Sequence, residues 1–295
     1  MTLEDFSREV RERTDAFLGR TLARLDDTAA ELQEALRYGL LLGGKRARPV
    51  LVQAAGQMLG ASAEVLDYPA AAVECIHAYS LIHDDMPEMD NDRMRRGQPC
   101  VHVRFGADLA LLAGDALQAM AFELLSDRGS PLGDELRVTL TALLSGAAGC
   151  RGMCGGQALD LMGGRRQMTL SDLQELHRRK TGALITASVL MGAHCSARVD
   201  PGILEALGEY AACTGLAFQV WDDVLDVIGD SAVTGKSTGA DAALGKSTYP
   251  SLLGLETARD HARQLCERAV AALEGLPADS RLLQDFARYA VSRDR

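Results

Sequence analysis

Apolar residues recur at helical spacing along most of this chain, and few segments alternate apolar with polar side chains. An apolar residue at every third or fourth position favours an amphipathic helix, whereas strict alternation favours a strand. Aromatic residues, which are enriched in strands, make up only 4% of the sequence. The pattern predicts helices over residues 3–41, 61–83, 107–126, 136–161, 170–195, 201–228, 249–273 and 280–293.

Glycine and proline gather between these segments and predict where the helices end. No shift in composition and no long linker divides the chain. We therefore predict an all-α fold, with one domain over residues 1–295 built as a helical bundle of roughly ten helices. The breaks fall at residues 43–44, 97–99, 129–133, 163–164, 201–202, 229–245 and 275–277.

Composition narrows the class of protein. The apolar fraction of 47% in 295 residues is enough for a large core, and the net charge of -10 without a basic stripe argues against a nucleic-acid partner. The first residues lack the basic leader and apolar run of a secretory signal, and Asp115 interrupts the long apolar stretch at residues 109–125. Seven cysteines without paired spacing suit a reducing compartment. We expect a cytoplasmic protein without stable membrane insertion.

The first of two acidic clusters reads His-Asp-Asp-Met-Pro-Glu-Met-Asp-Asn-Asp at residues 83–92. Asp84 would share a helix face with Glu88, but Pro87 lacks a backbone donor and clashes with the preceding turn. We expect the helix to end or bulge here, so that Asp90 rather than Glu88 turns toward Asp84.

The second acidic cluster lies on the helix predicted over residues 201–228. Asp222 and Asp226 are four residues apart and share one helix face, with Asp223 beside them. Their neighbours are apolar on nearly every side, so we expect a buried helix whose carboxylates line a cavity. Such closely spaced negative charges are costly unless cations neutralise them. Magnesium binds through oxygen and bridges to phosphates, so the two clusters predict a magnesium-dependent site for a diphosphate.

Small basic groups with glycine nearby recur in this acidic chain. Arginine matches phosphate oxygens with two parallel donors, and lysine supplies a compact charge. Several such groups indicate more than one phosphate-bearing substrate. The two Gly-Lys-Ser-Thr copies are not P-loops, because Asp230 and Ala240 stand where that motif needs glycine. The basic groups lie at residues 43–49, 95–97, 178–182, 235–237 and 245–247.

Two features of residues 145–160 have more than one interpretation. The run of small residues at 145–156 favours either close helix packing or a substrate passing near the backbone, with Gln157 and Asp160 just beyond it. Cys150 and Cys154 are one helical turn apart. Because no further Cys or His pair has zinc spacing, two buried helix cysteines are favoured over a metal site.

The motifs together resemble the trans-isoprenyl diphosphate synthase family, of the bacterial farnesyl diphosphate synthase type. The resemblance spans almost the whole chain, and no element of it is missing. It rests on the motifs at residues 43–49, 77–85, 114–117, 155–160, 180–184 and 218–223.

The resemblance implies a helical bundle around a deep central cavity, usually in a homodimer, with the two acidic clusters facing each other. The implied reaction condenses isopentenyl diphosphate with dimethylallyl and geranyl diphosphate to give (2E,6E)-farnesyl diphosphate. The implied cofactor is Mg²⁺, as three ions once substrate is bound. Geranyl or geranylgeranyl diphosphate synthesis by the same chemistry is the alternative. A class I terpene cyclase or a non-catalytic partner subunit is disfavoured, because the carboxylates and basic residues are intact.

The resemblance also implies a role for each matching residue. The metal ligands would be Asp84, Asp85, Asp90, Asp222, Asp223 and Asp226. The residues acting in catalysis would be Asp84, Asp85, Arg95, Lys180, Asp222 and Lys236. The allylic diphosphate would contact Arg95, Lys180, Thr181, Gln219, Lys236 and Lys246. Isopentenyl diphosphate would be held by Gly44, Lys45, Arg48, His77 and Arg96, with help from Arg293 and Arg295. Without the resemblance, His77 is better interpreted as a core histidine.

Product length is assigned by the same resemblance to the residue five positions before the first aspartate. Here that residue is Tyr79, and the next one, Ser80, is small. A helix rises 1.5 Å per residue, which places Tyr79 roughly 7–8 Å below Asp84. A bulky ring there would form the floor of the cavity and stop growth at fifteen carbons. The alternative is an aromatic core residue with no effect on product length.

Overall fold

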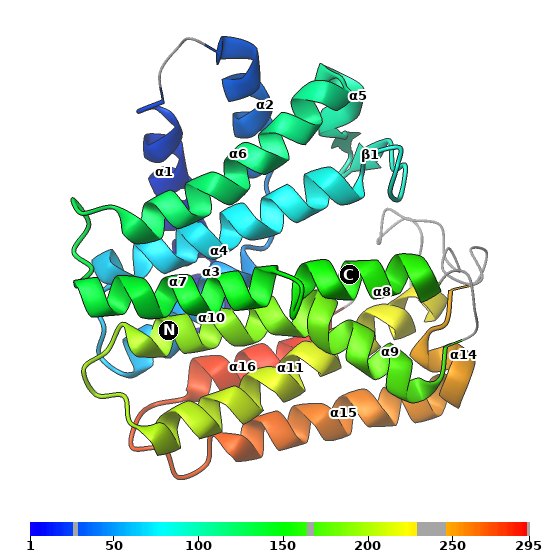
Figure 1. The fold of residues 1–295 in the computed structure, drawn as a ribbon. Helices are drawn as coiled ribbons and strands as arrows, with labels where there is room; N and C mark the ends of the chain where they lie inside the picture. Colours follow the sequence, from blue (N-terminus) through cyan, green and yellow to red (C-terminus); the bar gives the residue numbers. More distant parts are fainter. Residues whose placement is uncertain (26–28, 164–167, 229–245, 294–295) are drawn as a thin grey trace. The chain divides into compact units, whose positions relative to one another are not determined.

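A computed structural model describes residues 1–25, 29–163, 168–228 and 246–293, most of which are helical (Figure 1). The predicted all-α fold is confirmed. Within these ranges the strands are β1 (Met94–Arg95) and β2 (Gln98–Pro99), a two-residue antiparallel pair. The chain forms two compact units, the first of Met1–Gln53 and Ala61–Thr141, the second of Ala54–Gly60 and Ala142–Arg295. The single domain over 1–295 stays a prediction.

The described helices follow one another in this order. The first are α1 (Leu3–Leu22), α2 (Ala30–Leu41), α3 (Ala47–Met58), α4 (Ala63–Asp84), α5 (Val101–Phe105), α6 (Ala107–Ser126) and α7 (Asp134–Ala148). They are followed by α8 (Met153–Gly163), α9 (Leu170–His177), the π-helical turn η2 (Arg178–Gly182), α10 (Ala183–His194), α11 (Pro201–Ile228), α14 (Tyr249–Leu253), α15 (Leu255–Ala272) and α16 (Arg281–Ala290).

Helices α6 and α11 have the predicted bounds, whereas three predicted helices are divided. The predicted helix over 3–41 is α1 and α2, and the one over 136–161 is α7 and α8. The one over 249–273 is α14 and α15, because Gly254 between them has a positive φ of 83° that a helix does not allow. Helices α3 and α5 were not predicted from the sequence. Both are short, and α3 carries a proline in its first turn.

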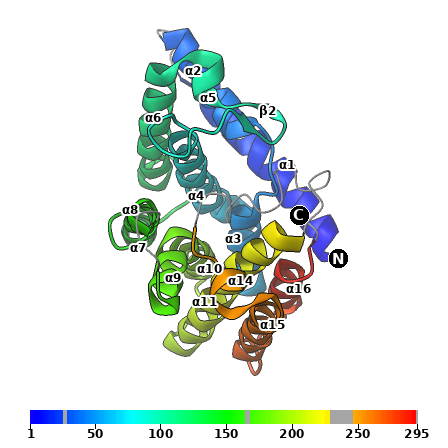
Figure 2. The same cartoon turned by 90° about the vertical axis from the view of Figure 1, so that its right-hand side faces the viewer.

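In the first unit, α4 and α6 lie side by side (Figures 1 and 2). Helix α4 is buried on all sides over its middle turns, where Ala71, Val73 and Ile76 are fully buried beside Glu74, which pairs with Arg46. A helix with this pattern belongs in a core. Helix α2 approaches the end of α4 closely, because a Cβ atom on Gly39 would lie 2.6 Å from the Ile82 side chain. The core thus reaches the turn where the first acidic cluster begins.

Of the described helices, α6 is the one that is long and apolar enough to cross a membrane, with a mean hydropathy of 1.4 over its most apolar window. A core helix of a water-soluble protein has the same composition. Buried Ala113 and Leu117 of α6 belong to the core of the first unit. The helix is therefore weak evidence for a membrane span.

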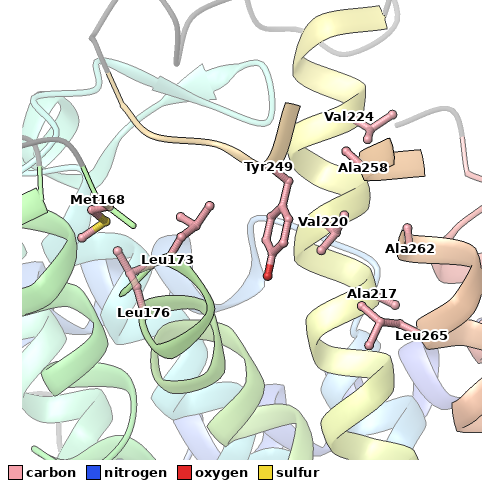
Figure 3. Close-up of a cluster of buried hydrophobic side chains, with 10 residues drawn as sticks. All are labelled: Met168, Leu173, Leu176, Ala217, Val220, Val224, Tyr249, Ala258, Ala262 and Leu265. Atoms are coloured by element: carbon pink, nitrogen blue, oxygen red, sulfur yellow. The ribbon is translucent and has the colours of Figure 1, made fainter. Parts of the chain in front are cut away.

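In the second unit, α11 and α15 run side by side and share a core with α9 and α14 (Figures 1 and 2). Figure 3 shows this core, in which the ring of Tyr249 lies between the side chains of α9 and those of α11. Tyr249 is fully buried, as is Val220 of α11. The second acidic cluster lies on the same turns of α11, since Asp222 and Asp223 stand between Val220 and Val224 of this core.

Candidate functional site

The first acidic cluster forms where α4 ends, as the proline predicted. Helix α4 ends at Asp84, and the chain then turns back so that the Asp90 amide donates to the Asp84 carbonyl at 2.8 Å. Asn91 completes the turn with a positive φ of 54°, and its amide donates to the Met86 carbonyl at 3.0 Å. The backbone of Asp90 therefore lies beside that of Asp84, and the turn of its carboxylate toward Asp84 stays a prediction.

Asp85 forms hydrogen bonds with Arg95, which lies on strand β1 of the β1–β2 hairpin. Arg96 and Gly97 form the turn of this hairpin with φ values of 53° and 75°, as a tight two-residue turn requires. Arg95 Nε donates to Asp85 at 2.8 Å, and its Nη2 donates at 2.6 Å. Burial alone would lower the pKa of Arg95, but these hydrogen bonds raise it on balance. One predicted metal ligand and one predicted diphosphate ligand therefore form an ion pair in this structure.

A cluster of positive charge occupies the same unit. His77 lies among Arg48, Arg95 and Arg96, and burial followed by these charges holds the pKa of His77 well below its ordinary value. Arg48 Nε is buried and has no hydrogen-bond partner among the described residues. Burial also lowers the pKa of Arg96. Charged donors gathered around a neutral imidazole favour binding of an anion.

Gly44 has a steric reason to be glycine. Its φ is 129°, and a Cβ atom there would lie 2.7 Å from the guanidinium of Arg96. Arg96 donates to the carbonyl of the neighbouring Gly43. The glycine pair therefore makes room for Arg96 beside the positive cluster. Lys45, in the same loop, is exposed.

In the second unit the three aspartates of α11 have different surroundings. The Asp222 side chain is 39% exposed and pairs with Arg293 at 2.7 Å. Asp223 is buried, and its Oδ2 accepts from the Tyr249 amide at 2.9 Å and lies 3.7 Å from His177 Nε2. Asp226 is partly exposed. The predicted burial of α11 is therefore found on the side of Asp223 and not on the side of Asp222.

The last turn of α11 differs from the prediction. We expected apolar neighbours to bury the helix on nearly every side, but Val227 and Ile228 are 48% and 40% exposed. Both lie at the end of the helix, after Val224, the last residue of α11 that belongs to the core drawn in Figure 3. The carboxylates of α11 are therefore at the edge of the core of this unit, where solvent and ions have access to Asp222.

The π-helical turn η2 presents Lys180 and Thr181. Lys180 Nζ donates to Asp160 at 2.6 Å, and Thr181 Oγ1 donates to the Gln219 side chain at 2.9 Å. Burial would raise the pKa of Asp160, but the charge of Lys180 outweighs it and lowers the pKa. π-Helical turns are rare and occur often at functional sites. Three predicted ligands of the allylic diphosphate thus lie on adjoining helices of one unit.

Close packing explains part of the small-residue run. A Cβ atom on Gly156 would lie 2.2 Å from the backbone nitrogen of Lys180, so the glycine lets α8 touch η2. The amide of the next residue, Gln157, has both polar atoms buried without a partner among the described residues. The first interpretation of the run is confirmed at Gly156, and Gln157 keeps the second open.

Comparison with known proteins decides the family. Residues 29–278 match the sequence model of the polyprenyl synthetase family. The chain belongs to this family. It is 51% identical over 282 residues to the farnesyl diphosphate synthase of Escherichia coli strain K12, covering 94% of each protein. It is 49% identical over 286 residues to the farnesyl diphosphate synthase of Haemophilus influenzae, covering 97% of this chain and 96% of that protein.

Solved structures of similar proteins have the same fold as this polyprenyl synthetase. A putative farnesyl-diphosphate synthase from Marinomonas sp. MED121 has a TM-score of 0.86 and 41% identity, with 99% of both chains covered. A geranyltransferase from Helicobacter pylori, complexed with magnesium and isoprenyl diphosphate, has a TM-score of 0.84 and 34% identity, with 99% of this chain and 97% of that chain covered. The predicted fold class is confirmed.

The proposed chain-length residue of this polyprenyl synthetase lies on α4. Tyr79 is 6% exposed, and its ring meets that of His83 edge to face at 5.8 Å. His83 Nε2 lies 3.1 Å from the carbonyl oxygen of Leu111 on α6. A Cβ atom on Gly114 would lie 2.0 Å from His83 Nε2, so the glycine of α6 makes room for the imidazole. Ser80 donates to the His77 carbonyl at 2.9 Å.

The carboxylates of this polyprenyl synthetase fit magnesium in the chemistry of their oxygen atoms. Among the described residues, no group of three or more His, Cys, Asp and Glu side chains is arranged to hold a metal ion by itself. Magnesium is ordinarily held by one or two carboxylates together with substrate phosphates and water rather than by a complete protein cage. The arrangement therefore suits an ion that arrives with a diphosphate.

Three predicted basic residues and the cysteines remain to be placed in the structure. Lys236 and Arg295 lie outside the described residues, and Lys246 lies at their edge. All seven cysteines are free, as expected, but Cys150 and Cys154 are exposed rather than buried. Cys150 lies between α7 and α8, and Cys154 lies in the exposed first turn of α8. A cavity of about 760 Å³ opens in the second unit, but none of the predicted site residues lines it, so we assign it no part in catalysis.

Sequence reasoning did not assign two residues that hold the site together. Asp160 pairs with Lys180, and its spacing of four from Gly156 was a usable signal, since both lie on the face of α8 toward η2. The amide of Tyr249 anchors Asp223 from 26 residues away. No local pattern predicts a contact of that sequence separation.

Proposed function

We propose that this polyprenyl synthetase makes (2E,6E)-farnesyl diphosphate from isopentenyl diphosphate and the allylic dimethylallyl and geranyl diphosphates. The observation that carries the proposal is that carboxylates and diphosphate-binding side chains occur together in the second unit. Carboxylates of α11 lie beside the Lys180, Thr181 and Gln219 set, which suits a diphosphate and its metal. The names of the relatives from E. coli and H. influenzae support the fifteen-carbon product.

In this proposal, Asp84, Asp85 and Asp90 hold magnesium in the first unit. Asp222, with Asp223 and Asp226, holds it in the second. Three ions bind together with the substrate, and when bound they neutralise the leaving diphosphate. The H. pylori neighbour complexed with magnesium and isoprenyl diphosphate supports the choice of metal. Asp85 would hold the metal in place of its ion pair with Arg95, and the guanidinium of Arg95 would then bind the diphosphate.

The basic residues divide between two diphosphates. Lys180 and Thr181 bind the allylic diphosphate, along with Arg95, Gln219, Lys236 and Lys246. Isopentenyl diphosphate binds at the positive cluster of Arg48, His77 and Arg96, with Gly44 and Lys45 in the adjoining loop. Arg48 Nε, buried without a hydrogen-bond partner among the described residues, supports an anion there, because an unsatisfied buried donor is costly.

The reaction follows from charge and proximity. The C–O bond of the allylic diphosphate breaks, and the diphosphate leaves with the electron pair while the cationic side chains stabilise it. The double bond of isopentenyl diphosphate attacks the allylic cation, and a new C–C bond forms between molecules held together. The adduct loses a proton to the departing diphosphate, which restores a double bond. Apolar side chains keep water away from the cation.

We propose that the enzyme works as a homodimer in the cytoplasm. The family resemblance supports both statements. The exposed apolar residues Leu111 and Leu112 on α6, which are 48% and 50% exposed, are candidates for the subunit contact.

Product analysis tests the proposal directly. Purified enzyme is incubated with Mg²⁺, labelled isopentenyl diphosphate and dimethylallyl diphosphate, and the products are separated by chromatography with an EDTA control. We expect a fifteen-carbon diphosphate that disappears with EDTA. A ten- or twenty-carbon product would keep the chemistry and refute the product length. No elongation with both substrates bound would favour a cyclase or a non-catalytic subunit.

A further inference from the structure

The last described residue, Arg293, is buried against α11 in the second unit. Its side chain is 5% exposed, and Nη2 donates to Asp222 Oδ1 at 2.7 Å and to the Phe218 carbonyl at 3.1 Å. The guanidinium carbon lies 3.8 Å from the centre of the Phe218 ring, a cation–π contact. Nε donates to the Ala290 carbonyl at 3.3 Å. These contacts fix the arginine in one position.

The backbone of Arg293 is anchored as well. Its carbonyl oxygen accepts a hydrogen bond from Trp221 Nε1 at 3.0 Å. Trp221 is the only tryptophan in the chain and directly precedes Asp222. The indole therefore reports on the position of Arg293 at the acidic cluster, and no other tryptophan contributes to its signal.

The positive charge of Arg293 opposes the binding of a metal ion at Asp222. The guanidinium neutralises Asp222, while the buried Asp223 is satisfied from another direction by the Tyr249 amide. A divalent ion on Asp222 would lie within a few ångströms of the guanidinium, where like charges repel strongly unless water screens them. Because the Asp222 side chain is 39% exposed, an ion from solution can reach it. The two cations therefore compete for one carboxylate.

We propose that Arg293 is a counter-ion that magnesium displaces from Asp222, so that metal binding at the second acidic cluster releases Arg293 from α11. The proposal rests on the proposed function, which places magnesium at Asp222. It differs from the role that the family resemblance implied for Arg293, since here the arginine acts on the metal site before any isopentenyl diphosphate binds. Arg293 is in this sense a positioning residue that sets the metal affinity of α11.

The first test measures metal affinity without substrate. Free Mn²⁺ is counted by electron paramagnetic resonance during titration of the full-length wild type and of the Arg293→Gln variant. The Asp222→Asn variant identifies the binding step that belongs to the second cluster. Loss of the competing charge should tighten that step about tenfold in Arg293→Gln. The matched control is Arg288→Gln, an exposed arginine of α16 paired with Asp285, which should bind Mn²⁺ as the wild type does.

The outcome that overturns the proposal is equal or weaker Mn²⁺ binding by Arg293→Gln when circular dichroism shows a folded variant. In that case the arginine only orients Asp222 or packs against Phe218. Arg293→Lys keeps the charge without the forked donors and should bind Mn²⁺ with an affinity closer to the wild type than to the glutamine variant.

The second test needs no change at Arg293. The single indole N–H resonance of ¹⁵N-labelled wild type is followed during titration with Mg²⁺, alone and with inorganic diphosphate. We expect it to shift with the same midpoint as metal binding and to stay unchanged in Asp222→Asn. If metal binds and elongation proceeds while the indole signal does not move, the inference is wrong and the proposed function stands. If no metal binds and no elongation occurs, the proposed function fails, and the inference with it.

Discussion

At the scale of single residues, two arginines of the motif at residues 43–49 differ in whether the protein itself satisfies their hydrogen-bond donors. Arg46 is satisfied by the protein itself, since it pairs with Glu74 at 2.7 Å and with Asp15 at 2.8 Å and donates to the Leu40 carbonyl at 2.8 Å. Arg48, two residues on, has a buried Nε without a partner among the described residues. The first arginine holds the fold, and the second is available to a phosphate. Nothing in the motif sequence separates the two roles.

His77 predicts a specific dependence of stability on pH. Its pKa is held well below 6.5 in the folded protein, so the unfolded chain binds a proton that the folded chain does not as the pH falls through about 6.5. The free energy of unfolding therefore decreases below that pH, by at most about 1.4 kcal/mol per pH unit for this one group. In His77→Asn this contribution should vanish. Urea unfolding at pH 7.5, 6.5 and 5.5 measures it.

The difference in stability between the wild type and His77→Asn is the informative quantity, because all other titrating groups are shared. It should change in favour of the variant as the pH falls from 6.5 to 5.5. A difference that stays constant over this range would mean that folded His77 takes up its proton as easily as the unfolded chain, and the neutral assignment would be wrong.

Tyr79 predicts a change in product length. Tyr79→Ala removes the ring from the proposed cavity floor, so we expect diphosphates longer than fifteen carbons from the same substrates. Tyr79→Phe keeps the ring and is the matched control, with a product distribution like that of the wild type. Chromatography of dephosphorylated products distinguishes them. Identical distributions for the alanine variant and the wild type would assign Tyr79 to the core alone, despite its contact with His83.

At the scale of helices, glycine determines which pairs can touch. A Cβ atom on Gly156 would lie 2.2 Å from the Lys180 backbone nitrogen, and the backbone cannot turn aside as a side chain can. On α7, Gly146 has no atom within 4 Å of the same position. The two glycines belong to one small-residue run, yet only Gly156 is required for contact between helices.

The two glycines make a matched pair of substitutions. Gly156→Ala should destabilise the protein by about 1–3 kcal/mol through overpacking, and it should impair turnover by moving Lys180. Gly146→Ala should be neutral or stabilising by up to about 1 kcal/mol, because alanine favours the helix. Urea unfolding midpoints and product formation measure both effects. Equal stability of the two variants would show that α8 can move away from η2 without cost.

The sequence predicted the long helices well and their interruptions poorly. Helices α6 and α11 keep one apolar pattern from end to end, so their bounds could be predicted. The break at Gly254 and the short α5 depend on backbone angles and on neighbours in space, which a local pattern does not contain. The same holds for the site. The acidic and basic motifs could be found from spacing, whereas the ion pairs of Asp85 with Arg95 and of Asp222 with Arg293 required the fold.

At the scale of the whole molecule, chemistry is distributed over both compact units. The first unit contains the cluster that begins at Asp84 and the positive group around His77. The second contains the aspartates of α11 and the Lys180 set. Both units thus contain local groups of basic residues, although the chain as a whole has a net charge of -10. The proposed reaction uses residues from each unit, so both must be folded in the active enzyme.

The path of the chain predicts that the two units unfold together. Helices α3 and α7 each have residues in both units, with the boundaries after Gln53 and after Thr141. Because helix formation is cooperative, loss of one unit should unravel the helices that it shares with the other. We therefore expect a single transition in scanning calorimetry, with equal calorimetric and van't Hoff enthalpies, as for one domain over residues 1–295. Two separate transitions would show instead that the units are independent domains. So would a change in Trp221 fluorescence at a different temperature from the loss of helix measured by circular dichroism.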